Sequence, residues 1–347
     1  MRKLLISLLM IACLVLPASA TAITAPDAPA EIEKYIPEES NSFASDVWYI
    51  IRKALREITP SLSEVMNICA SVLAVQLLIA AVKGFTGVAQ KAVIIAGVIV
   101  LSGLLLGPSK SLISLGTETI RSISEYNMML LPTMTAALAA QGATVTSATL
   151  YAGTVVMDTV LTGIVVKVIT PLLYTYTAVG IASVVVDESV LHQLLGFIKW
   201  LITWILKIVV YVFTGYLGIT GVISGTIDAA TMKATKLAIS GVVPIIGNII
   251  SDASEAVLVG TGIVKNSVGI YGAIVIIAIC IAPFLRVGLQ YIMLKATGGI
   301  SSLYADKKTV MVVQHISTVM GFVAAMTGVV CLLQLISIVC FLKGVSV

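Results

Sequence analysis

The stretch from Thr318 to Leu342, TVMGFVAAMTGVVCLLQLISIVCFL, contains no Asp, Glu, Lys or Arg. It is longer than the roughly 20 apolar residues that an α-helix needs to cross the hydrocarbon core of a bilayer. Such a span must be helical, because lipid offers no partners for free backbone N–H and C=O groups. This stretch therefore predicts a transmembrane helix.

Comparable apolar stretches recur through the chain, at about 65–82, 92–106, 160–186, 194–223 and 268–289. The whole chain has 59% hydrophobic and 11% charged residues, whereas an ordinary soluble domain has roughly 25% charged residues. With a mean hydropathy of +1.08, a water-soluble fold of this size could not bury so much apolar surface. The sequence predicts an all-α, polytopic integral membrane protein with five clear spans and one or two less certain ones.

The first residues have the pattern of an export signal. Arg2 and Lys3 precede an apolar run over 4–16, which Pro17 and the small residues Ala18-Ser19-Ala20 follow. The run is shorter than a membrane span requires, which favours cleavage over a retained anchor. We therefore expect residues 1–20 to be a cleavable signal peptide.

Residues 21–63 form a polar, acidic segment that such a signal would export, and residues 64–347 form the predicted membrane domain. Within the exported segment, basic and aromatic residues over 47–58 lie at helical spacing. This pattern fits a helix lying along the membrane surface, and a solvated linker is the alternative. The orientation follows from basic residues between predicted spans, which favour cytoplasmic loops. These residues are Lys83, Lys91, Arg286, Lys295, Lys307 and Lys308.

No catalytic or cofactor-binding constellation stands out. His192 and His315 are far apart in the sequence, and neither belongs to a zinc-binding motif. The five cysteines lie in apolar segments without the close pairing of metal or redox motifs, so we expect buried free thiols. The basic residues form no run that could follow a phosphate backbone, which argues against nucleic acid as a partner. We therefore expect a protein that is not an enzyme and has no cofactor.

Small and helix-breaking residues over 221–247 are candidate packing positions. Gly221 and Gly225 form a GxxxG pair, which can seat a neighbouring helix. Gly241, Pro244 and Gly247 interrupt the next apolar stretch, and interrupted segments tend to be re-entrant or packed inside protein.

Charged residues near the apolar segments are candidate functional residues, because charge within a bilayer is costly. Asp252 and Glu255 follow the broken stretch and share one helix face. They could line a polar path or contact a basic partner, and the alternative is that they solvate a helix start at the membrane surface. Other such charges are Asp158, Lys167, Lys199, Lys207 and Arg286.

The stretches Gly241–Leu258, GVVPIIGNIISDASEAVL, and Val264–Gly272, VKNSVGIYG, resemble the stage III sporulation protein AE family of endospore-forming bacteria. The signal, the acidic exported segment and the number of spans also match, so the resemblance extends over nearly the whole sequence. It implies a multi-pass subunit, in the mother-cell membrane around the forespore, of a channel between the two cells. The implied role is to support forespore development and late forespore gene expression.

The partners that the resemblance implies are the other membrane proteins of the same sporulation operon, a forespore-side channel protein and membrane lipids. A different hypothesis is a secondary transporter of a small solute, with its site at the broken segment 241–247. Transporters of that kind usually have two interrupted helices in corresponding halves, and the sequence offers no second one. The channel subunit is therefore the favoured hypothesis.

Overall fold

The computed structural model of the chain describes residues 25–37, 42–83, 89–140, 144–186, 189–219 and 267–343. All regular secondary structure in these residues is helical. One π-helical turn, η2, joins α5 and α6 into a continuous rod. The elements are α2 (Ala30–Glu33), α3 (Phe43–Lys83), α4 (Gln90–Ala140), α5 (Thr144–Ile164), η2 (Val165–Ile169), α6 (Thr170–Val186), α7 (Ser189–Ile219), α10 (Ser267–Ser301) and α11 (Lys307–Lys343).

Six helical rods in the described residues are long and apolar enough to cross a membrane, which confirms the predicted polytopic all-α class. All six predicted spans fall on these rods, although the span over 194–223 extends past the end of α7 into residues outside the described part. The rods cover Phe43–Lys83, Gln90–Ala137, Tyr151–Val186, Ser189–Tyr216, Val268–Ser301 and Lys307–Phe341.

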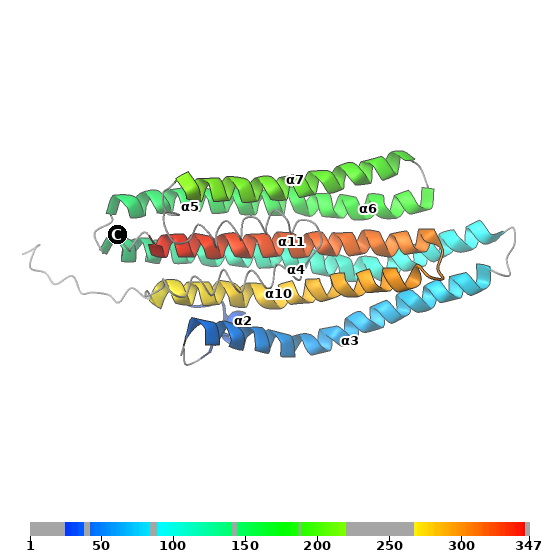
Figure 1. Cartoon of the computed structure of the whole chain (residues 1–347), viewed down its shortest axis with the longest axis horizontal. Coiled ribbons are helices and arrows are strands. Elements are labelled where there is room, and N and C mark those ends of the chain that lie inside the picture. The colour runs from blue at the N-terminus through cyan, green and yellow to red at the C-terminus, as the bar shows by residue number, and fades with distance from the viewer. Residues whose placement is uncertain are drawn as a thin grey trace, which may run out of the picture.

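The rods form an elongated antiparallel bundle (Figure 1). In that view α5, α6 and α7 lie above α11 and α4, and α10 and α3 lie below them. The most apolar windows of α10 and α11 are 67% and 78% buried, whereas those of the other four rods are 28% to 33% buried. The last two helices therefore form the centre of the bundle, and the others cover them.

Residues 47–58 are helical and form the first turns of α3, continuous with the predicted span over 65–82. The buried residues of α3 explain this continuity. Ile50 and Ala54 begin a stripe at helical spacing that continues through Val65, Cys69 and Val72, so a single amphipathic helix packs on the bundle along its whole length. The helix is bent in Figure 1, and it contains Pro60, which removes one backbone hydrogen bond of the kind that keeps a helix straight.

Two of the predicted cytoplasmic loops lie at the same end of the bundle. Lys83 ends α3 and forms an ion pair with Asp306, between α10 and α11, at 2.8 Å. The hydroxyl of Tyr304 in that connection donates to the carbonyl oxygen of Leu73 at 3.2 Å. The last turns of α3, α6 and α10 and the first turns of α4, α7 and α11 lie at this end, and the last turns of α4 and the first turns of α5 lie at the other (Figure 1).

The mixed stretch over 107–159 forms parts of two long helices. α4 continues through Pro108 and Pro132 to Ala140, and α5 returns beside it. A small residue lets α4 approach a neighbouring helix closely. A Cβ on Gly116 would lie 2.5 Å from Val323 of α11, so α4 and α11 approach closely there.

Candidate functional site

The residues singled out as candidate packing or polar-path positions lie outside the described part of the chain. These are Gly221, Gly225, Gly241, Pro244, Gly247, Asp252 and Glu255. The structure therefore leaves their roles as predictions. Among the intramembrane charges, Asp158 is the residue around which a site is built.

Asp158 lies in α5 with 0% of its surface exposed. The hydroxyl of Ser124 in α4 donates to its Oδ2 at 2.6 Å, and the side-chain amide of Gln334 in α11 donates to its Oδ1. The carboxyl group thus joins three helices in the interior of the bundle. Because an unpaired polar group in an apolar interior is costly, these contacts fix the relative positions of the three helices.

Further buried polar residues lie one turn from the three that make these contacts. Asn127 follows Ser124 by three residues, Ser337 follows Gln334 by three, and Thr154 precedes Asp158 by four. Residues at these spacings share a helix face. The Asn127 amide, Gln334 Oε1 and Ser337 Oγ have no hydrogen-bond partner in the described part of the chain. We call Ser124, Asn127, Thr154, Asp158, Gln334 and Ser337 the Asp158 cluster.

The π-helical turn η2 follows this cluster directly along the α5–α6 rod. Such turns insert one residue into an α-helix and are frequent at functional sites. Thr170 ends the turn, and its hydroxyl lies 3.2 Å from both the Val165 carbonyl oxygen and the Thr117 hydroxyl of α4. Lys167 within the turn is exposed, whereas Asp158 is buried, so the two charged residues occupy different faces of the α5–α6 rod.

The remaining intramembrane charges stay at the surface of the bundle. Lys199 is exposed on α7 beside the stacked rings of Phe197 and Trp200, and Lys207 is half-buried. This agrees with long basic side chains that cover apolar surface and extend their charge outward. Arg286 of α10 forms an exposed ion pair with Glu64 of α3 at 3.4 Å.

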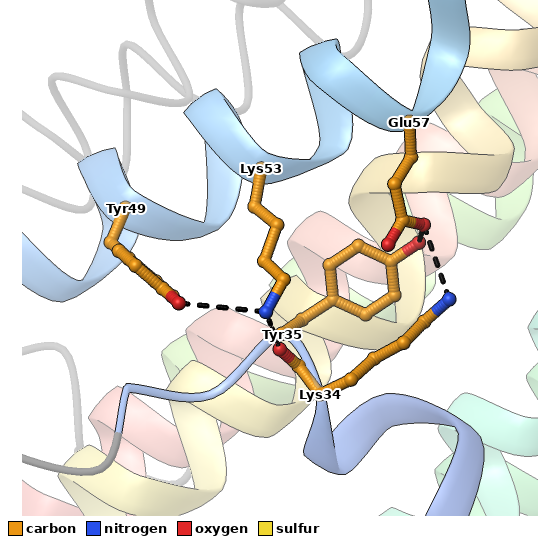
Figure 2. Close-up of polar contacts among 5 residues, drawn as sticks. All are labelled: Lys34, Tyr35, Tyr49, Lys53 and Glu57. Atoms are coloured by element: carbon orange, nitrogen blue, oxygen red, sulfur yellow. Dashed lines mark hydrogen bonds and ion pairs between the residues drawn. The ribbon is translucent and has the colours of Figure 1, made fainter. Parts of the chain in front are cut away.

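A second polar group fastens the segment 25–37 onto α3 (Figure 2). The buried hydroxyl of Tyr35 donates to Glu57, and Lys34 Nζ lies 3.2 Å from the same carboxylate. Lys53 Nζ donates to the Lys34 carbonyl oxygen and lies 3.5 Å from the Tyr49 hydroxyl. Burial, together with the neighbouring carboxylate of Glu57, raises the pKa of Tyr35, so this hydroxyl stays a donor.

No group of His, Cys, Asp and Glu in the described residues is arranged to hold a metal ion. Cys69, Cys280, Cys331 and Cys340 are buried thiols that form no disulfide in the described part of the chain, which confirms the predicted buried thiols for these four residues. The cost of a charge in an apolar segment predicted Asp158 as a candidate, whereas Ser124 and Gln334 were not predicted. A single amide inside the uncharged stretch 318–342 is the signal that could have found Gln334.

The described residues define a polytopic helical membrane protein whose interior holds a hydrogen-bonded carboxyl group. The sequence model of one family, stage III sporulation protein AE, matches residues 30–344. The chain belongs to the stage III sporulation protein AE family, which confirms the resemblance and fits a role in sporulation.

A similar curated protein is stage III sporulation protein AE of Bacillus subtilis (strain 168). It is 23% identical over 175 residues, which are 50% of this chain and 44% of that relative. This match thus spans less than half of the relative's length. No solved structure matches the chain.

Proposed function

We propose that this chain is a membrane subunit of a channel between mother cell and forespore, needed for forespore development and late forespore gene expression. The observation that carries the proposal is family membership over residues 30–344. The location in the mother-cell membrane around the forespore is part of the same proposal. The six candidate spans are compatible with a subunit that is held within one of the two membranes.

The packing of a single bundle favours a wall element over a complete pore. Val287 of α10 and Met320, Val323 and Val330 of α11 have 0% of their surface exposed, and they lie in one continuous apolar core. Apart from the Asp158 cluster, mostly apolar side chains thus fill the described centre of the bundle, as in protein interiors generally. A conduit would then lie between several subunits, not through one.

The proposed partners are the other membrane proteins of the same sporulation operon and the channel protein on the forespore side. A polytopic bundle with a segment anchored along one of its helices suits such an assembly. Tyr35 and Glu57 hold that segment against α3 and so present a fixed surface at this end of the bundle. Cross-linking in sporulating cells, followed by purification of the tagged chain, tests whether these proteins lie beside it.

Deletion of the gene in its native host tests the proposal directly. We expect heat-resistant spores to be lost after engulfment, while vegetative growth and solute uptake stay normal. Complementation with the unchanged gene should restore spore counts. Normal sporulation combined with an uptake defect would overturn the channel subunit in favour of the secondary transporter.

A further inference from the structure

A level here means a height along the long axis of the bundle. Direct contacts between side chains show which residues of the other helices lie at the same level as Asp158. Ser124 of α4 and Gln334 of α11 hydrogen-bond to Asp158 of α5, so these three residues lie side by side. Thr154, one turn before Asp158, has its hydroxyl 3.4 Å from that of Tyr216 on α7. Because α5 and α7 run in opposite directions (Figure 1), the residues of α7 about one turn before Tyr216 lie at the level of Asp158.

Helix α10 reaches the same level at Ala278. A Cβ on Gly272 of α10 would lie 2.4 Å from Leu130 of α4, so those two residues are adjacent. The helices are antiparallel (Figure 1), and each residue advances an α-helix by the same rise. Ser124 precedes Leu130 by six residues, and Ala278 follows Gly272 by six. Ala278 is therefore level with Ser124 and with Asp158.

Helix α3 reaches this level at Arg56. The ion pair between Arg286 of α10 and Glu64 of α3 aligns two helices that run in the same direction. Ala278 precedes Arg286 by eight residues, and Arg56 precedes Glu64 by eight. Arg56 thus lies at the level of Asp158 to within about one turn, given the reach of the paired side chains.

On the α5 and α7 side, the large outward side chains at this level are apolar, and the hydroxyl of the exposed Thr159 donates to the Val155 carbonyl oxygen of its own helix at 2.7 Å. Val156 and Val160 of α5 are 59% and 48% exposed, and Tyr211 and Val212 of α7 are 51% and 54% exposed. An apolar surface of this kind on a polytopic membrane protein is suited to contact with lipid. The level of Asp158 is therefore lipid-compatible on this side of the bundle.

On α3 and α4, the outward side chains at the same level are charged. Glu118, Arg121 and Glu125 of α4 follow one another at spacings of three and four, which places them in one exposed stripe. Arg52 and Arg56 of α3 are exposed one turn apart. In the described part of the chain none of these five residues belongs to an ion pair. We call the two groups the α4 face and the α3 face.

Ionised side chains that face lipid are costly, and they normally face protein or a water-filled space. The α3 and α4 faces therefore need a polar neighbour at a level where the opposite side of the bundle is apolar. We propose that the α3 face of one copy of this chain packs against the α4 face of a second copy. Charge complementarity argues for this occupant, because Arg52 and Arg56 are basic and the α4 face carries two carboxylates beside one arginine.

The symmetry of membrane assemblies supports the same pairing. Copies related by rotation about the bilayer normal keep every residue at its level, so Arg56 of one copy meets the stripe around Arg121 of the next. Glu118 and Glu125 flank that arginine on the same stripe and offer carboxylates to the incoming guanidinium groups. Because the two faces differ, the contact is heterologous, and its repetition builds a ring of copies.

Charge reversal in differently tagged copies tests the contact. The copies are produced in one membrane, solubilised in mild detergent and purified through one tag, and the other tag is measured. Reversal of the α4 face by Glu118→Lys with Glu125→Lys, or of the α3 face by Arg52→Glu with Arg56→Glu, should lower co-purification about tenfold, because like charges then meet. All four substitutions together should restore it, since the faces are again complementary.

The matched control is Lys167→Glu with Lys199→Glu, which makes the same change of charge as Arg52→Glu with Arg56→Glu at two exposed residues of η2 and α7, on the side of the bundle opposite α3 (Figure 1). It should leave co-purification unchanged. If reversal lowers the yield of folded protein, Glu118→Gln with Glu125→Gln gives a milder version of the same test. The proposal is overturned if unaltered copies do not co-purify, if the single-face variants associate normally, or if the fourfold variant fails to recover. The readout is association between copies, so its outcome is separate from that of the sporulation test.

Discussion

The Nζ atom of Lys83, in the last turn of α3, lies 2.8 Å from a carboxylate oxygen of Asp306, just before α11. The backbone N–H of Lys308 donates to the other oxygen of that carboxylate at 3.0 Å. Burial by itself raises the pKa of Asp306, but the hydrogen bonds and charges of Lys83 and Lys308 outweigh it. The pKa is therefore held below its ordinary value of 3.8.

Replacement of this carboxylate should lower stability in a pH-dependent way. Because the folded-state pKa of Asp306 is lowered, its contribution is complete above pH 3.8 and is lost as the pH falls through the lowered value. Asp306→Asn should cost about 1 kcal/mol near pH 7. Thermal unfolding in detergent should show a steeper loss below about pH 4 for the wild type than for the variant. Parallel pH profiles, or no effect of Lys83→Gln, would contradict the role of the pair.

The two ends of the bundle should be accessible from opposite sides of the membrane. Leu303, beside Asp306, is 86% exposed, and Trp48 at the other end of α3 is 58% exposed. An impermeant maleimide should label Leu303→Cys from the cytoplasmic side only, because the basic loops favour that side, and Trp48→Cys from the other side only. The parent chain is the control, since its four described cysteines are buried. Labelling of both positions from one side would contradict a crossing by α3.

Packing of α4 against α11 should be sensitive to a single methyl group. A Cβ on Gly116 would lie 2.5 Å from Cγ1 of Val323, whose β-branched side chain has little freedom to move. Gly116→Ala should therefore destabilise the protein by about 1–3 kcal/mol through overpacking. Gly103→Ala, on the same helix with open space around it, should be neutral or slightly stabilising. Equal melting temperatures for the two variants would show that α4 and α11 do not approach this closely.

Substitutions of Asp158 should separate structure from function. Asp158→Ala leaves the Ser124 hydroxyl and the Gln334 amide without their buried partner, at a cost of about 1–3 kcal/mol. Asp158→Asn keeps a side chain of the same shape that can bond to both, so its stability should stay close to that of the wild type. Melting temperature and spore counts measure the two effects. A stable Asn variant that forms no spores would assign a role to the charge, and normal spore counts would limit Asp158 to packing.

The segment 25–37 should open when its buried hydroxyl is removed. Tyr35→Phe leaves the ring but deletes the hydrogen bond to Glu57, so hydrogen exchange over residues 30–37 should quicken by about tenfold. The control is Tyr49→Phe, because that hydroxyl is only 3.5 Å from Lys53 at the surface and should matter less. Faster exchange in the control than in Tyr35→Phe would contradict this assignment.

Local sequence patterns predicted the positions of the helices well. They predicted less well where a helix begins or continues. The apolar stretches 65–82 and 268–289 fall within α3 and α10, because the length and composition of a membrane span are local properties. The continuation of α3 back to Phe43 was not predicted. Its charged first turns resemble an interfacial helix in sequence, and only their packing on the bundle extends the same buried stripe.

The residues of the candidate site also divide into those that local patterns predict and those that only the tertiary structure brings together. The cost of a charge in an apolar segment marked Asp158 from the sequence alone. Its partners are 34 and 176 residues away, and local patterns carry no information about contacts at that separation. The positions over 221–255 stay predictions, since they lie outside the described residues.

The sequence by itself determined the helical class, the membrane setting and the family, because lipid imposes helices on long apolar stretches and the motif over 241–272 is distinctive. Tertiary structure alone decided which helices form the centre, that Asp158 meets Ser124 and Gln334, and that charged faces of α3 and α4 lie level with apolar faces of α5 and α7. The physical reason is that hydropathy shows whether a segment is stable in an apolar environment such as lipid or a protein interior. Packing between helices that are distant in the sequence decides which neighbour covers it.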